Sequence, residues 1–303
     1  MRKTIVSLLS VIFLASGLFA QPLLLEQATN VVPQKTLEVG IDNLTYQSDV
    51  TEITNSTIKF TNTALIIPVV ARYGVTNDIE AMLTIPYMSL SQKLEISGNS
   101  ATTEDAQLAD IHIAGKKTIV LPESWGLTGW NLGAMLDLSL PTGSQSDKFT
   151  TEFRNGMNIK PLVAASKNFS PNVSFAKELT FNANISYNLT GEYEPKSWGV
   201  KLDPADVFEI GVGAESPCVL VNGLNRILEL NYRTLSEQKL AGTAIAGTSG
   251  SQMDLVLGAR YTFLSGLLKS KLGFVLALGD EKYRTYDYKI VAGVTYLFND
   301  IIK

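Results

Sequence analysis

Residues 181–190 alternate between apolar and small polar side chains, with the apolar residues at the odd positions. Successive side chains of a β-strand point to opposite faces, so this segment predicts a strand with one apolar and one polar face. About ten residues is also the length that a tilted strand needs to cross a bilayer. The same pattern recurs along most of the chain, and it predicts a transmembrane β-barrel.

Alternation of this kind predicts about twelve strands. Their expected ranges are 36–46, 58–73, 77–91, 107–121, 128–141, 157–168, 173–193, 206–215, 217–234, 252–264, 270–279 and 286–298. In the strand at 128–141, Leu136 falls on the apolar face and Asp137 on the polar face. The expected fold class is all-β, an up-and-down antiparallel barrel formed by residues 36–303.

The lengths of the connections distinguish a membrane barrel from a soluble β-sandwich, whose strands also alternate. Short turns are expected at 74–77, 122–126, 169–172, 216–217 and 265–268, and longer polar stretches at 47–57, 92–106, 142–156, 194–205, 235–251 and 280–285. Outer-membrane barrels have short periplasmic turns and longer outer loops, and an even number of strands places both chain ends in the periplasm. The regular alternation of long and short connections between strands therefore favours a membrane barrel over a soluble sandwich.

The first twenty residues have the layout of a secretory signal peptide. Arg2 and Lys3 form a basic start, residues 5–14 are apolar, and small residues precede Ala20. We expect cleavage after Ala20 and a periplasmic N-terminal segment at 21–35, with a retained anchor helix as the alternative. No later window holds eighteen consecutive apolar residues, so no helical span is expected.

Composition and the C-terminus bear on compartment and partners. The net charge is −4 without a basic block, which argues against a nucleic-acid partner. The single Cys218 cannot form an intrachain disulfide. Gly293, Tyr296 and Phe298 resemble the C-terminal signal of bacterial outer-membrane barrels, although five more residues follow. The expected location is the bacterial outer membrane, with outer-membrane lipid, the barrel assembly machinery and a small-molecule solute as partners.

Aromatic residues cluster near the ends of the predicted strands. Membrane barrels carry such girdles at both lipid–water interfaces, whereas packing in an ordinary core is the alternative. The residues are Tyr46, Tyr73, Tyr87, Trp125, Trp130, Phe169, Tyr193, Trp198, Tyr232, Tyr261, Phe263, Tyr286, Tyr288, Tyr296 and Phe298.

Charged residues in the middle of strands are expected to face the lumen, because an Arg or Lys in lipid costs about 2–4 kcal/mol at mid-depth. The expected inward set is Glu38, Asp42, Arg72, Glu80, Asp110, His112, Lys116, Asp137, Lys160, Glu229, Arg233, Asp254, Arg260, Lys271, Asp287 and Lys289. From this set we select as selectivity candidates Arg72, Glu80, Asp137, Glu229, Arg233, Asp254 and Arg260. Such charges can select solutes in a water-filled channel, or they can pair and fill a narrow lumen. We favour a narrow channel.

Enzyme hypotheses find little support in the sequence. His112 is the single histidine, and it falls on the polar face of its strand without a neighbouring serine. The acid pair Glu104 and Asp105 lies in an expected loop, where solvation is the usual role. No phosphate loop, dinucleotide fingerprint or Cys/His metal spacing is present. We therefore expect no catalytic, cofactor-binding or metal-binding residues.

Two short motifs resemble a known family. Residues 72–80 form an Arg-Tyr-Gly-hydrophobic-Thr-Asn hairpin that is followed by Pro86 and Tyr87. Residues 138–144 form the end of a strand and the Pro-Thr-Gly loop that follows it. Both resemble elements of the MetA-pathway of phenol degradation family, over roughly residues 36 to 298. The resemblance implies an outer-membrane barrel for uptake of small, hydrophobic or aromatic compounds. The alternative is a non-conducting structural or surface-interaction barrel that acts through its long loops.

Overall fold

Long antiparallel strands dominate the computed structural model, which describes residues 29–52, 58–121, 129–144, 156–169, 178–195, 199–278 and 286–299. Within these residues, no helix is long and apolar enough to cross a bilayer. The expected signal peptide, Trp125 and Trp198 lie outside the described residues.

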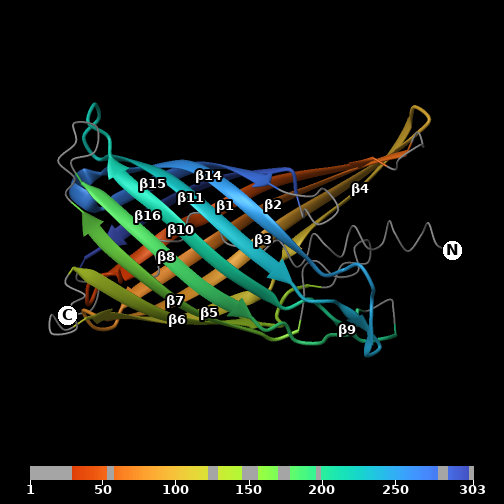
Figure 1. Cartoon of the computed structure of the whole chain (residues 1–303), viewed down its shortest axis with the longest axis horizontal. Helices are drawn as coiled ribbons and strands as arrows, with labels where there is room; N and C mark the ends of the chain where they lie inside the picture. Colours follow the sequence, from red (N-terminus) through yellow and green to blue (C-terminus); the bar gives the residue numbers. More distant parts are fainter. Residues whose placement is uncertain are drawn as a thin grey trace.

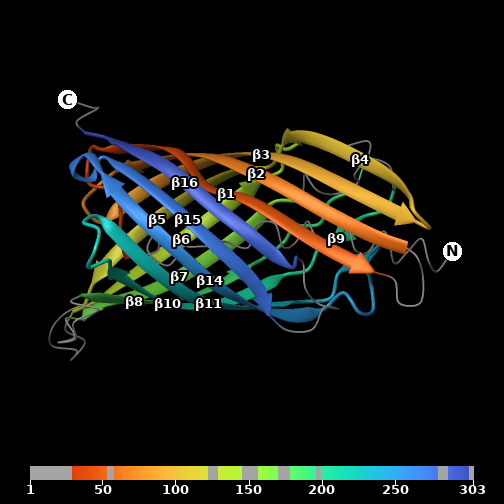
Figure 2. The same ribbon diagram turned by 90° about the horizontal axis from the view of Figure 1, so that it is seen from above.

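Twelve strands close into one barrel, as the alternation predicts. They are β1 (Leu37–Glu52), β2 (Ile58–Gly74), β3 (Ile79–Ile96), β5 (Ile111–Val120), β6 (Trp130–Leu140), β7 (Asn158–Phe169), β8 (Leu179–Asn188), β10 (Val207–Pro217), β11 (Leu224–Leu235), β14 (Gly250–Phe263), β15 (Leu268–Leu278) and β16 (Tyr288–Phe298). Each pairs antiparallel with the next, and β1 pairs with β16 to close the ladder. Figures 1 and 2 show the strands running obliquely to the long axis.

The two ends of the barrel differ in their connections. At one end, here named the turn end, residues 75–78, 218–223 and 264–267 link neighbouring strands, and the last of these links contains a short 3-10 helix (Leu264–Gly266). The expected turn at 216–217 is wrong by a few residues, because β10 continues to Pro217 and the turn follows it. At the opposite end, the loop end, the connections are longer and carry structure of their own.

The expected loop at 92–106 is wrong, because these residues continue the sheet. β3 runs on to Ile96, and the chain turns at Ser97 and Gly98 into β4 (Asn99–Leu108). β4 pairs along its whole length with the last part of β3, residues 87–96. Figure 1 shows this hairpin projecting beyond the other strands. A strand outside the apolar layer needs no apolar face, so alternation gives no signal for it.

A small second sheet also forms at the loop end, in stretches expected to be loops. It consists of β9 (Leu202–Asp203), β12 (Lys239–Leu240) and β13 (Thr243–Ala244). Lys239 and Asp203 form an ion pair of 3.0 Å across it. The connections at 194–205 and 235–251 are therefore joined to one another.

Apolar and polar residues separate onto the two faces of the wall. Leu136 is 48% exposed on the outside, whereas its neighbour Asp137 is 8% exposed and faces inward. Aromatic side chains meet on the outer surface near both ends: Phe274 stacks on Tyr288 at 6.0 Å near the loop end, and Tyr296 meets Phe298 at 4.7 Å near the turn end. This arrangement matches two interfacial girdles.

A β-bulge interrupts the alternation in β1. The register of β1 shifts against both β2 and β16 between Ile41 and the residues that follow, and Asn43 takes a positive φ of 62°. Because one extra residue is inserted, the inward side chains change from even to odd positions. Asp42 therefore faces inward before the bulge and Gln47 faces inward after it.

The expected periplasmic segment, where it is described, lies against the inner side of the wall at the turn end. The N–H of Lys35 donates to the carbonyl of Gly74 at 2.9 Å, and the N–H of Val32 donates to the carboxylate of Glu80 at 2.7 Å. The hydroxyl of Thr118 donates to the carbonyl of Thr29. Residues 29–36 are thus held by β2, β3 and β5.

The separation of the faces predicts the effect of a charge on the outside. Leu136→Arg should lower the free energy of unfolding by about 2–4 kcal/mol, because the guanidinium would lie in the apolar layer. Leu136→Met is the matched control and should cost under about 1.5 kcal/mol. Denaturant titration of the protein refolded in lipid measures both. Equal stability of the two variants would show that Leu136 does not face lipid.

Candidate functional site

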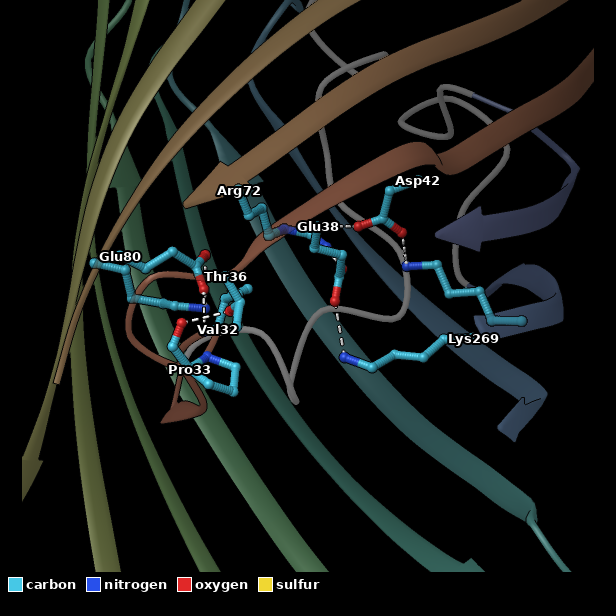
Figure 3. Close-up of polar contacts among 10 residues, drawn as sticks. Val32, Pro33, Thr36, Glu38, Asp42, Arg72, Glu80 and Lys269 are labelled. Carbon is cyan, nitrogen blue, oxygen red and sulfur yellow. Dashed lines mark hydrogen bonds and ion pairs between the residues drawn. The ribbon is translucent and has the colours of Figure 1, made fainter. Parts of the chain in front are cut away.

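The inner wall near the turn end carries a network of buried ion pairs. The guanidinium of Arg72, from β2, contacts the carboxylates of Glu38 and Asp42, both from β1. Lys269 reaches Glu38 at 2.8 Å, and Lys271 contacts Asp42. Figure 3 shows Glu38 between Arg72 and Lys269. Two acids on one strand are thereby matched by cations from other strands of the wall.

The same network borders a cavity of about 90 Å³. On its far side, Glu215 from β10 accepts hydrogen bonds from Asn225 and Arg260, and Glu229 from β11 lines the wall beside them. The other lining residues are Asn182, Ala214, Ile227, Ser270, Gly293 and Thr295. The cavity thus presents carboxylates and cations in equal number: Glu38, Asp42, Glu215 and Glu229 against Arg72, Arg260, Lys269 and Lys271.

Glu80 connects the barrel wall to the N-terminal segment. Its carboxylate pairs with Lys116 at 3.2 Å and accepts the N–H of Val32 at 2.7 Å. The side chains of Glu80 and Lys116 are both nearly fully buried. Glu80 is one of the selectivity candidates, and the structure shows it engaged in holding residues 29–36 (Figure 3).

Further ion pairs lie deeper in the lumen, on the strands β5 to β10. Lys160 from β7 meets Glu209 from β10 at 2.6 Å, and Ser186 donates to the same carboxylate at 3.1 Å. His112 and Asp137 approach one another at 3.3 Å across β5 and β6. The single histidine therefore lies against a carboxylate on the inner face.

Near the loop end, the carboxylate of Asp254 is shared by three side chains. It accepts the hydroxyl of Tyr286 and the amide of Gln252, the latter at 2.6 Å, and it lies 3.8 Å from the guanidinium of Arg233. Two cations lie over the ring of Tyr286, with Arg233 at 5.1 Å and Lys289 at 3.7 Å from its centre. Cations over an aromatic face are attracted by its quadrupole.

The structure distributes the seven selectivity candidates over four places. Arg72, Glu229 and Arg260 line the one cavity, and Arg233 and Asp254 form the cluster near the loop end. Glu80 and Asp137 lie apart from both groups, each in its own pair. Asp110, also in the inward set, is fully buried and accepts the N–H of Gly143 at 2.8 Å, so it anchors the Pro-Thr-Gly loop.

Two assignments at the start of β16 are wrong. Asp287 is expected in the lumen, but its carboxylate accepts the N–H of Val50 at 3.0 Å at the loop end. Tyr286 is expected in a girdle, but it is 1% exposed and faces inward. The reason is that β16 begins at Tyr288, so the alternation read across 286–298 does not extend to its first two residues.

Sequence reasoning missed Glu209 and Glu215, which share the inward face of β10 with Gly211 and Gly213. Glu209 and Glu215 are separated by an even number of positions, so alternation alone predicts that they share one face of the strand. Lys269 was missed because it lies one residue before the predicted start of its strand. Tyr286 and Gln47 gave no signal, because their orientation depends on a strand end and a bulge.

The described residues hold no group of three or more His, Cys, Asp or Glu side chains placed to bind a metal ion. The chemistry that the lumen offers is electrostatic: fixed charges of both signs, amides and a tyrosine. Moving these charges out of water costs free energy, which the attraction within each pair offsets. Removing one member of a buried pair costs about 3–5 kcal/mol of stability, because the other charge stays buried without a partner. Outside the lumen, backbone N–H groups lower the pKa of the Cys218 thiol in its turn.

Comparisons with known proteins match the fold but not the sequence. No protein-family model and no curated protein sequence matches the chain. The structure is similar to the crystal structure of an outer-membrane channel from Pseudomonas putida F1, with a TM-score of 0.65 and 12% identity over 92% of this chain and 99% of that one. It is also similar to the transport unit of the autotransporter AIDA-I from Escherichia coli, with a TM-score of 0.50 and 12% identity over 95% of each chain. The fold is that of outer-membrane β-barrels.

The close contact at Gly74 predicts how the N-terminal segment can be released. A Cβ on Gly74 would lie 2.0 Å from the carbonyl oxygen of Pro33 and 2.5 Å from that of Val32, so Gly74→Ala must displace residues 29–36. Overpacking of this kind costs about 1–3 kcal/mol, so a cysteine at Val32 should react with a thiol reagent about tenfold faster.

Gly115→Ala, on β5, is the matched control, because nothing lies within 4 Å of the position that its added methyl group would take. It should leave the labelling rate unchanged. Both variants are compared in a Cys218→Ser background, so that the cysteine introduced by Val32→Cys is the one thiol. Equal rates in the two alanine variants would show that Gly74 does not hold the segment.

Proposed function

We propose that this protein is an outer-membrane channel that passively conducts small solutes, including hydrophobic or aromatic ones. The carrying observation is a cavity of about 90 Å³ inside a closed barrel, lined by equal numbers of acids and cations. Fixed charges of both signs across a narrow lumen create a transverse field that orients and selects solutes. The proposed activity is non-enzymatic.

The inner wall also supports passage of apolar groups. Ala64 and Ile66 on β2 form a buried inward cluster with Met88 and Leu90 on β3. An apolar stripe beside a charged wall suits a solute with one apolar and one polar part. We further propose membership of the MetA-pathway of phenol degradation family, supported by the hairpin at 72–80 and by the Pro-Thr-Gly loop that Asp110 anchors.

A non-conducting barrel is the second candidate, and two observations favour it. Lys116, Lys160 and their partner acids are largely buried, so they fill part of the lumen. The projecting β3–β4 hairpin offers a surface for another molecule at the loop end (Figure 2). Conductance of the refolded protein in a planar bilayer separates the two candidates, because a filled lumen passes no current.

The channel proposal predicts opposite changes in ion selectivity from two residues of the same cavity. Arg260→Gln removes a cation from the wall and should lower the anion/cation permeability ratio. Glu229→Gln removes an acid and should raise it, because lumen charges set the field that a permeating ion feels. Reversal potentials in a salt gradient measure both. Changes in the same direction, in variants that fold, would contradict control by the wall charges.

A triple replacement of Arg72, Arg233 and Arg260 by Gln should also lower this ratio, but it carries a larger folding risk. Arg72 contacts two acids, Glu38 and Asp42, and its replacement would remove one cation from each. The single variants avoid that problem. Migration of unheated samples on a denaturing gel reports whether each barrel is folded.

An outer-membrane location with the turn end in the periplasm predicts which sites react on intact cells. In a Cys218→Ser background, cysteines at Ser100 and Ala246 at the loop end should react with an impermeant thiol reagent. Cysteines at Leu220 and Ser265 at the turn end should react only after lysis. All four sites are exposed, so access alone does not distinguish them. The reverse labelling pattern would invert the proposed orientation.

A further inference from the structure

One buried cation of the lumen differs from the others in its surroundings. Arg72, Lys116, Lys160 and Arg233 each have a carboxylate within ion-pairing distance. Lys289 on β16 is 2% exposed, and no carboxylate of the described residues lies within ion-pairing distance of it. Its ammonium lies 3.7 Å from the centre of the Tyr286 ring. A buried charge without an ionic partner is costly, and a bound anion would offset that cost.

Two buried amide side chains on the next two strands, β1 and β2, also carry groups that are unpaired among the described residues. Gln47 on β1 is paired in register with Lys289, is fully buried, and has no hydrogen bond at either side-chain amide atom within the part of the chain that the structure describes. Asn62 on the next strand, β2, is 1% exposed and its amide nitrogen is likewise unpaired there. Buried polar groups are nearly always hydrogen-bonded, so such exceptions indicate a bound molecule or water.

The nearest acid of this cluster is already engaged. Asp254 accepts the hydroxyl of Tyr286 and the amide of Gln252, and it lies 3.8 Å from Arg233. The ring of Tyr286 contacts both Lys289 and Arg233, while its hydroxyl is held by Asp254. Lys289, Gln47 and Asn62 thus place donors on three adjacent strands, and no carboxylate of the described residues lies within ion-pairing distance of Lys289.

We propose that Lys289, Gln47 and Asn62 form a binding site for the carboxylate of a small monocarboxylic solute. A carboxylate has two oxygens with about four acceptor positions, enough for the ammonium and both amide N–H groups. Hydrogen bonds to charged groups are also the stronger ones. Val275, the register partner of Lys289 on β15, and Val291 are fully buried beside the site and suit an apolar remainder. The inference rests on the proposed function, because a solute must enter the lumen to reach the site.

The site is tested by ligand-dependent stability, which does not require the channel to conduct. Benzoate is the probe and benzyl alcohol is its uncharged counterpart. A ligand that binds only the folded protein raises the unfolding temperature, and the rise grows with its affinity. Benzoate should raise the unfolding temperature of the refolded wild-type barrel and benzyl alcohol should not.

Three variants assign the effect to the site. Lys289→Met should weaken benzoate binding by at least about tenfold, since a hydrogen bond to a charged group is lost with the charge itself. Lys289→Arg should retain most of the binding. Lys239→Met, which removes a lysine from the exposed second sheet, is the control and should bind as the wild type does. Lys289→Met is expected to fold, because replacing an unpaired buried charge by an apolar side chain is seldom destabilising.

The outcomes separate this inference from the proposed function. No benzoate shift in the wild type, or an equal shift in Lys289→Met, would overturn the site and assign the unpaired donors to water. A shift that depends on Lys289 in a barrel without conductance would support the site and defeat the channel. With both intact, benzoate should reduce the chloride current through the wild type and not through Lys289→Met.

Discussion

Closure of the hydrogen-bond ladder between β1 and β16 is the constraint on which the rest of the structure depends. An apolar layer offers no partner for backbone N–H and C=O groups, so a sheet that crosses it must have no free edge. Once the sheet is closed, every strand has one face toward lipid and one toward the lumen. The choice of Asp137 for the inside and Leu136 for the outside follows from this geometry.

The enclosed face sets the second condition, because charges that leave water need partners. Arg72 matches two acids of β1, Lys160 matches Glu209, and Glu80 serves both Lys116 and the N-terminal segment. Pairs of this kind contribute little net stability but are costly to break, so they define one arrangement of the lumen rather than strengthen it. Lys289 differs from these residues, because its ammonium lies over the ring of Tyr286 and has no carboxylate of the described residues within ion-pairing distance.

The sequence predicts the strands correctly where contact with lipid requires apolar and polar side chains to alternate. It predicts them wrongly where no such alternation is required. The twelve strands, their faces and most inward charges follow from alternation. The β3–β4 hairpin lies outside the apolar layer and gave no such pattern. Gln47 and Tyr286 depend on a bulge and on a strand end, and neither leaves a mark in the order of apolar and polar residues. Ion partners such as Glu215 and Arg260 come from different strands, so their pairing required the three-dimensional register.

The attachment of residues 29–36 has a consequence for the order of assembly. Pairing of β1 with β16 joins parts of the chain separated by nearly its whole length, and contacts of such high separation form late and slowly. The contacts of the N-terminal segment with Glu80 and Thr118 span 48 and 89 residues, a much shorter separation than that between β1 and β16. Because contacts of shorter separation cost less loop-closure entropy, we expect the segment to be in place before β1 pairs with β16. The last strand would then meet a β1 that is already held beside β2.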